Sequence, residues 1–172
     1  MAESPVPTST DTLRLSPSSA PKLHLAFRPT VPLISETRHF AGHLLDSVLD
    51  DSDAASRVAL TIHELLENTL KYSIDGLAQI VLLVSDEAGR RTIEVRASNQ
   101  ASPEQAAELS RRIEAIGQAS DPMGFYIGLM RESAQRGGSG LGLARIRVEG
   151  EMSLSCALEG DKVTVSATTP AE

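Results

Sequence analysis

A long amphipathic segment between residues 53 and 73 constrains the fold of this chain most. Its predicted core positions recur every three or four residues, as on one side of an α-helix: Val58, Ile62, Leu65, Leu66 and Thr69. A second set has the i, i+4, i+7 and i+8 spacing of another helix face: Glu64, Asn68, Lys71 and Tyr72. The segment therefore predicts a helix that packs on a core through one side. Its other side presents an acid, an amide and a lysine to solvent or to a cavity.

The composition shows what kind of core this helix can pack against. Hydrophobic residues make up 41% of the 172 positions, but aromatic residues make up only 3% and there is no tryptophan. We therefore expect one domain whose core consists of leucine, isoleucine, valine and alanine. The formal net charge of −7 argues against a nucleic-acid partner, because such proteins usually carry a basic patch.

The sequence shows no secretory signal and no membrane span. Its longest clean apolar run, from Ile80 to Val84, is far shorter than the roughly 20 residues that a membrane helix needs. We expect a cytoplasmic protein without a membrane partner. Residues 1–22, rich in proline, serine and threonine, predict a disordered tail. The domain is expected to span 23–169, and 170–172 to form a short C-terminal tail.

Alternating polarity predicts five strands, at 22–28, 79–85, 92–98, 151–158 and 162–168. Glycine-containing turns join the last four into two hairpins. A first helix is expected to open at Pro32 and Ser35, and the long helix to be capped by Ser52 or Asp53.

Three more helices are predicted after the first hairpin. Ser102, Pro103 and Gln105 have the pattern of a capping box at a helix start. The next helix begins at Asp121–Pro122, and its expected packing residues are Met123, Tyr126, Ile127 and Met130. A short helix ends near Val148. The resulting order, β-α-α-β-β-α-α-α-β-β, predicts an α+β fold: a two-layer sandwich of helices on a mixed, mostly antiparallel sheet.

A glycine cluster precedes the last predicted helix. It consists of Gly137, Gly138, Ser139, Gly140, Leu141, Gly142 and Leu143. It lacks the Gly-Lys-Ser/Thr of a Walker loop and does not follow a strand, as the loop of a dinucleotide fold does. Backbone amides at such a helix start can hold phosphate oxygens. The alternative is a flexible turn between two helices.

Taken together, the two segments resemble the ATP-binding domain of the GHKL superfamily. Residues 68–73 (Asn-Thr-Leu-Lys-Tyr-Ser) resemble its N box, and residues 138–143 (Gly-Ser-Gly-Leu-Gly-Leu) resemble its second glycine box. The resemblance covers residues 23 to 168 and implies the Bergerat (GHKL ATPase) fold. Within the superfamily, the chain most resembles the stand-alone bacterial anti-sigma-factor serine kinases, which act by partner switching.

This resemblance implies ATP and Mg²⁺ as cofactors and assigns roles to the matching residues. Asn68 would ligate Mg²⁺, and Glu64 would orient or deprotonate the attacking hydroxyl. Lys71 would neutralise phosphate charge and Tyr72 would line the cleft. The lid hinge and phosphate cradle would be Gly137, Gly138, Ser139, Gly140, Leu141, Gly142 and Leu143. The alternative for Glu64 is a solvated helix charge paired with Lys71 or Arg57.

The sequence departs from the family at the first glycine box. Asn99 stands where the family has the aspartate that reads adenine, and both glycines that should follow are missing. An asparagine side chain carries both a donor and an acceptor, so it can still meet an adenine amino group.

Three functional hypotheses follow. The first is a serine/threonine kinase that phosphorylates a STAS-domain antagonist, with a sigma factor or another regulator as a further partner and a homodimer as its assembly. The second is a non-catalytic module of the same fold that sequesters a partner protein, and the third is a detached histidine-kinase-like catalytic domain.

Overall fold

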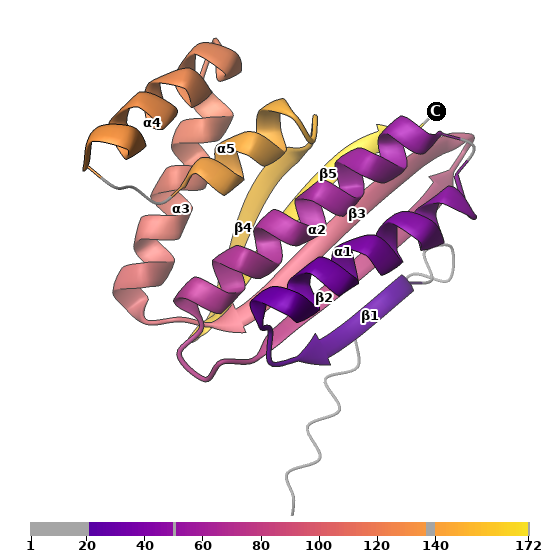
Figure 1. The fold of residues 1–172 in the computed structure, drawn as a ribbon, viewed down its shortest axis with the longest axis horizontal. Coiled ribbons are helices and arrows are strands. Elements are labelled where there is room, and N and C mark those ends of the chain that lie inside the picture. Colours follow the sequence, from indigo (N-terminus) through magenta and orange to yellow (C-terminus); the bar gives the residue numbers. More distant parts are fainter. Residues whose placement is uncertain (1–20, 50, 137–139, 172) are drawn as a thin grey trace, which may run out of the picture.

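The computed structural model describes residues 21–49, 51–136 and 140–171, and within them it confirms the predicted order of elements (Figure 1). The strands are β1 (Pro21–Phe27), β2 (Ala78–Glu87), β3 (Arg90–Gln100), β4 (Ser153–Glu159) and β5 (Lys162–Ala171). The helices are α1 (Val31–Asp46), α2 (Ser52–Tyr72), α3 (Pro103–Gln118), α4 (Pro122–Arg136) and α5 (Leu141–Val148). Positions 1–20 of the predicted tail and 137–139 of the predicted glycine cluster lie outside the described residues.

The strands form one sheet in the order β1-β2-β3-β5-β4, and each neighbouring pair is antiparallel. The helices lie on one face of it, with α1 and α2 along the sheet and α3, α4 and α5 gathered at one end (Figure 1). The predicted α+β class, with helices on an antiparallel sheet, is confirmed. In β3 the side chains alternate between the two faces, so Ile93, Val95 and Ala97 are buried under the helices.

Both predicted hairpins are present, and their turns are short. β2 and β3 are joined by Ala88 and Gly89, which both have positive φ angles (53° and 76°). This is the backbone conformation that twisted two-residue hairpins favour. Gly160, with a φ of 64°, lies in the turn between β4 and β5.

The long helix α2 is the centre of the core. All five of its predicted core residues are buried, and α2 packs against α1, α5, β2, β3 and β5. No described helix combines the length and the apolar character needed to cross a membrane.

The start of α1 and the cap of α2 differ from the predicted ones. α1 begins at Val31 with Thr30 as its N-cap, one residue before the predicted Pro32. α2 is capped by Asp51, whose carboxylate accepts hydrogen bonds from the backbone N–H groups of Asp53 (2.9 Å) and Ala54 (3.0 Å). In a run of neighbouring Asp and Ser residues every side chain can cap, and the backbone decides which residue stays extended.

Asp51→Ala is therefore expected to lower the free energy of unfolding by about 1 kcal/mol, the usual cost of losing an N-cap. Ser52→Ala, one position inside the helix, is the matched control and should stay within about 0.5 kcal/mol of the wild type. Urea unfolding followed by circular dichroism measures both. Equal losses in the two variants would contradict the assignment of the cap.

Helix α4 corrects a second expectation. Met123, Ile127 and Met130 were predicted to pack, but they are 52%, 37% and 40% exposed. α4 instead lies against α5, and its side chains that reach the core are Phe125, Tyr126 and Leu129. The four predicted residues lie on one side of the helix, but the side that α4 turns to the core is rotated from it and has only Tyr126 in common with the prediction.

Candidate functional site

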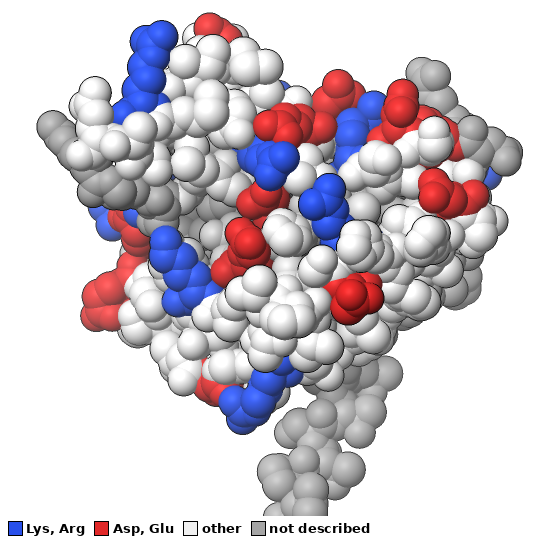
Figure 2. Space-filling view, viewed as in Figure 1, with Lys and Arg blue, Asp and Glu red and all other residues white. Residues whose placement is uncertain are grey.

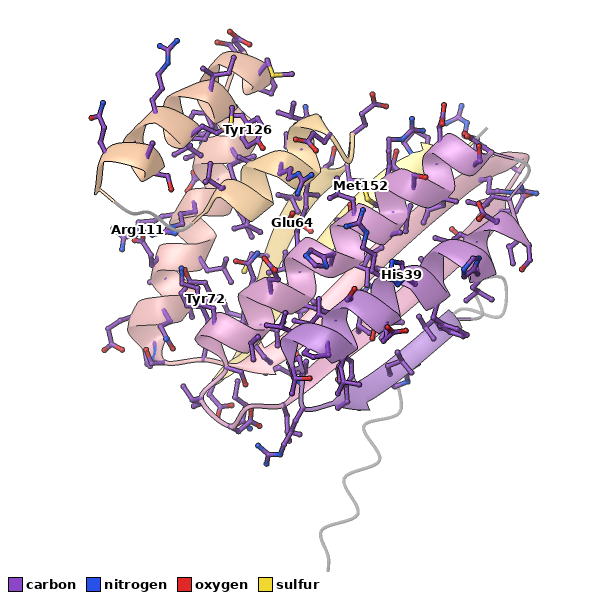
Figure 3. The ribbon with its side chains drawn as sticks, in the orientation of Figure 1. His39, Glu64, Tyr72, Arg111, Tyr126 and Met152 are labelled. Carbon is purple, nitrogen blue, oxygen red and sulfur yellow. The ribbon has the colours of Figure 1, made fainter. Side chains whose placement is uncertain are left out.

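A cavity of about 230 Å³ opens where the polar face of α2 meets α3 and α5. Its walls are Asn68, Tyr72, Glu104, Gln105, Glu108, Leu109, Arg112 and Leu143. In Figure 3, Tyr72 and Glu64 both lie on the side of α2 that is turned toward these helices, whereas His39 lies on α1. The amphipathic pattern of α2 therefore directs its polar residues into the space between helices, away from the sheet.

A second, much smaller cavity of about 20 Å³ adjoins the first, because Asn68 and Tyr72 line both. It extends to the sheet, where Ala97 and Asn99 of β3 contribute to its wall. Asn99 continues the inward alternation of Ile93, Val95 and Ala97, so its side chain is on the helix side. The structure thus brings Asn68, Tyr72 and Asn99 together, although they come from two different elements.

The two asparagines present their amides in a similar way. Asn68 Nδ2 donates to the backbone oxygen of Glu64 (3.0 Å), and Asn99 Nδ2 donates to the backbone oxygen of Gln100 (3.0 Å). Each bond occupies the amino end of the amide. The carbonyl end of Asn68 accepts no hydrogen bond from the described residues, and it is an oxygen ligand of the kind that Mg²⁺ prefers.

Glu64 is buried, with 7% of its surface exposed, and its carboxylate is ion-paired. Oε1 accepts a hydrogen bond from Nη1 of Arg145 on α5, at 2.9 Å. The alternative of a solvated charge paired with Lys71 or Arg57 is therefore wrong. Arg57 lies instead 3.6 Å from Glu151 and 4.0 Å from Asp51.

The described part of the glycine cluster lies against Glu64. Gly140 is the N-cap of α5 and has a φ of +110°, a left-handed conformation that glycine adopts without strain. A Cβ at Gly142 would stand 2.4 Å from Oε2 of Glu64, so glycine at this position lets α5 approach α2. Leu141 begins α5, and the Leu143 side chain is buried at the cavity wall.

Lys71 is not brought to either cavity. Its side chain is exposed, and its Nζ lies 5.3 Å from the centre of the Tyr72 ring. This cation–π contact involves the same Tyr72 ring that lines the cavity.

Two arginines that the sequence did not single out as site residues take part in the site. Arg145 contacts Glu64, and Arg112 lines the cavity, with its guanidinium 3.3 Å from the Cβ position of Gly140. Arg112 follows another arginine, Arg111, and this pair is the only local feature that marks it. No local feature of the sequence marks Arg145, because its contact with Glu64 joins residues 81 positions apart.

The charged side chains at the larger cavity leave a net negative charge. Glu104 and Glu108 contribute two negative charges and Arg112 one positive charge, a formal sum of −1. A hydrogen bond from Arg112, together with the charge of that guanidinium, lowers the pKa of Glu108, so this carboxylate stays ionised. On the helix face of the molecule as a whole, acidic and basic side chains are interspersed (Figure 2).

These residues fit a magnesium nucleotide better than a free one. A cavity of net negative charge disfavours bare phosphates, and a divalent cation would remove that conflict. No three described histidine, cysteine, aspartate or glutamate residues form a metal cluster. Mg²⁺ commonly takes one or two protein oxygens and completes its shell with phosphates and water, so Asn68 suffices as a protein ligand.

Comparison with known proteins supports the fold alone. No model of a protein family and no curated protein sequence matches the chain. Among solved structures, the chain is similar to one in the crystal structure of the SiaB–SiaC complex from Pseudomonas aeruginosa. The TM-score is 0.65 at 20% sequence identity, over 87% of this chain and 89% of that chain.

Proposed function

We propose that this protein binds Mg-ATP in the cavity between α2, α3 and α5 and transfers phosphate to a serine or threonine of a partner protein. The observation that carries the proposal is the meeting of Asn68, Tyr72 and Asn99 around adjoining cavities, beside a buried Glu64. The candidate oxygen ligand, the aromatic side chain and the candidate base thereby come from α2, and the candidate adenine-reading amide comes from strand β3.

Each residue has a role in this scheme that its position allows. Asn68 holds the cation through its amide oxygen, and Tyr72 packs against the nucleotide. Asn99 meets the adenine ring of the nucleotide from the sheet side, and the backbone amides at the start of α5 face its phosphates. Bound Mg-ATP supplies the γ-phosphoryl group.

Glu64 serves as the general base. Its Oε2 takes the hydroxyl proton while the partner's oxygen bonds to the γ-phosphorus and the β,γ P–O bond breaks. The products are ADP and the phosphorylated partner, and Glu64 then returns the proton to water.

The proposed partner is a STAS-domain protein in a partner-switching pathway. Two observations support it: the resemblance to anti-sigma-factor kinases, and a structural neighbour that was crystallised as a complex of two proteins. By the same resemblance we propose a sigma factor or another regulator as a further partner, a homodimer as the assembly and the cytoplasm as the location.

Asn68→Ala tests the nucleotide site directly. Losing a ligand to a charged group costs about 1.5–3 kcal/mol, so Mg-ATP should bind roughly 10–100-fold more weakly by calorimetry. Gln118→Ala removes an exposed amide from α3 and should leave the affinity unchanged. Equal affinities in all three proteins would place the nucleotide elsewhere.

A non-catalytic module that sequesters its partner is the second candidate, and two observations favour it. Asn99 replaces the family's adenine-reading acid, and one oxygen of Glu64 is already engaged by Arg145. In that case wild-type protein would bind no Mg-ATP and would still form a stable complex with the STAS partner. If the phosphate on the product is acid-labile, as phosphohistidine is, the result would instead favour the third hypothesis, a detached histidine-kinase-like catalytic domain.

A further inference from the structure

A chain of polar contacts runs from Glu64 through α5 to α4. Arg145 Nη1 donates to Glu64 Oε1 (2.9 Å), and Arg145 Nε donates to Glu149 Oε2 (2.8 Å). The other oxygen of Glu149 accepts from the Tyr126 hydroxyl of α4 (3.2 Å). The contact chain thus links three helices, and Tyr126 lies where α4 approaches α5 (Figure 3).

Arg145 fixes the orientation of the Glu64 carboxylate. A buried carboxylate requires a partner, and the cation that contacts it among the described residues is Arg145. Because Oε1 is engaged, Oε2 is left facing Gly142, the position at which a Cβ would stand 2.4 Å away. Oε1 is directed at Arg145, and Oε2 is directed at Gly142, next to the start of α5.

We propose that Arg145 is a positioning residue, which holds Glu64 with Oε2 directed at the start of α5. Through Glu149 and Tyr126, it also links this orientation of Glu64 to the position of α4. The inference rests on the proposed function, in which Oε2 takes the proton. It adds that a ligand or partner displacing α4 would remove the Tyr126 hydroxyl from Glu149, and would thereby loosen the Arg145–Glu149 pair that helps to hold Glu64 in this orientation. The planar guanidinium suits this task, since it bridges two carboxylates with separate N–H groups.

Tyr126 reports on the contact chain without any nucleotide. Burial raises the pKa of Tyr126 and the charge of Glu149 raises it further, whereas Arg145 lowers it and Glu64 contributes a smaller increase. The chain has no tryptophan and only two tyrosines, so in a Tyr72→Phe background the ultraviolet signal of tyrosinate belongs to Tyr126. Arg145→Gln should raise the pKa of Tyr126, and Glu64→Gln should shift it in the opposite direction. Circular dichroism measured at each pH shows whether the protein is still folded, and only those pH values are used for the pKa of Tyr126.

A double-mutant cycle at neutral pH gives a second measure that needs no titration. Tyr126→Phe and Arg145→Gln should lower the melting temperature by less together than the sum of their separate effects, because both act through Glu149. Additive effects, together with an unchanged Tyr126 pKa in Arg145→Gln, would overturn the proposed chain.

Kinetics then test positioning. Arg145→Gln should lower kcat for transfer about 10–100-fold, the usual loss when a supporting partner of a catalytic group is removed, with KM for Mg-ATP almost unchanged. Arg145→Lys should recover part of kcat, because lysine restores the positive charge but not the planar set of N–H donors that contacts two carboxylates. If kcat is unchanged in Arg145→Gln while the pKa of Tyr126 shifts, Arg145 links the helices but does not position Glu64 for phosphoryl transfer. If the wild type transfers no phosphate, the proposed function fails, whereas the titration still decides whether Arg145 links Glu64 to α4.

Discussion

Glu64→Gln is expected to lower phosphoryl transfer to a protein partner by about 10²–10⁴-fold, the contribution that a general base usually makes. Glutamine keeps the size of the side chain and can still accept a hydrogen bond from Arg145, but it cannot take a proton. Affinity for Mg-ATP should therefore stay within about 3-fold of the wild type, because Glu64 meets the hydroxyl and not the nucleotide. Transfer of labelled phosphate and calorimetry measure the two quantities.

Glu67 offers a matched control one turn along the same helix. Its carboxylate is half-exposed and contacts His63 at 3.2 Å, away from the residues that line the cavities. Glu67→Gln should leave transfer within about 2-fold of the wild type, as most surface substitutions do. If Glu64→Gln behaved the same way, Glu64 would be a structural partner of Arg145 and the non-catalytic module would be favoured.

Gly142→Ala should lower the free energy of unfolding by about 1–3 kcal/mol and also abolish transfer. A methyl group at Gly142 would stand 2.4 Å from Oε2 of Glu64, so either the carboxylate must leave its ion pair or α5 must move away from α2. Both responses disrupt the contact with Arg145. The gain in helix propensity, up to about 1 kcal/mol, is too small to offset this loss.

Two comparisons isolate the clash. Gly128 lies in α4, where a Cβ would meet nothing within 4 Å, so Gly128→Ala should stabilise the protein by up to about 1 kcal/mol. In a Glu64→Ala background the obstructing oxygen is gone, and Gly142→Ala should become neutral or stabilising. Destabilisation of the same size in both backgrounds would mean that the close approach of α5 to Glu64 does not exist in solution.

Local patterns were sufficient to predict the elements of this fold. The 3.6-residue period of α2 identified its buried side correctly, and the capping box of Ser102 and Gln105 is present at the start of α3. The hairpins followed from alternation and from glycine at turns, because both are properties of a few consecutive residues. The predicted cap of α2 and three of the four packing residues predicted for α4 were wrong, since both depend on the neighbours that a segment meets.

Spacing alone could group the candidate site residues only where they share one helix, whereas Asn99 and the glycine cluster came from the family resemblance. Glu64, Asn68 and Tyr72 were found by spacing, but the same spacing also included Lys71, which the structure leaves exposed. Arg145 could not be found in this way. Its contact with Glu64 depends on how closely α5 approaches α2, and no single segment encodes that distance.

The pairing of β3 with β5 has a consequence for how this site comes into being. These strands are distant in the sequence: Ser98 and Thr164, 66 positions apart, share a hydrogen bond of 2.8 Å between their hydroxyls. α3, α4 and α5 all lie in the chain between them, so the walls of the cavity assemble only when this long loop has closed. A molecule that binds the cavity therefore binds the completed fold and not the open chain. By mass action it would raise the midpoint of unfolding, so the ligand would also protect the fold that creates its site.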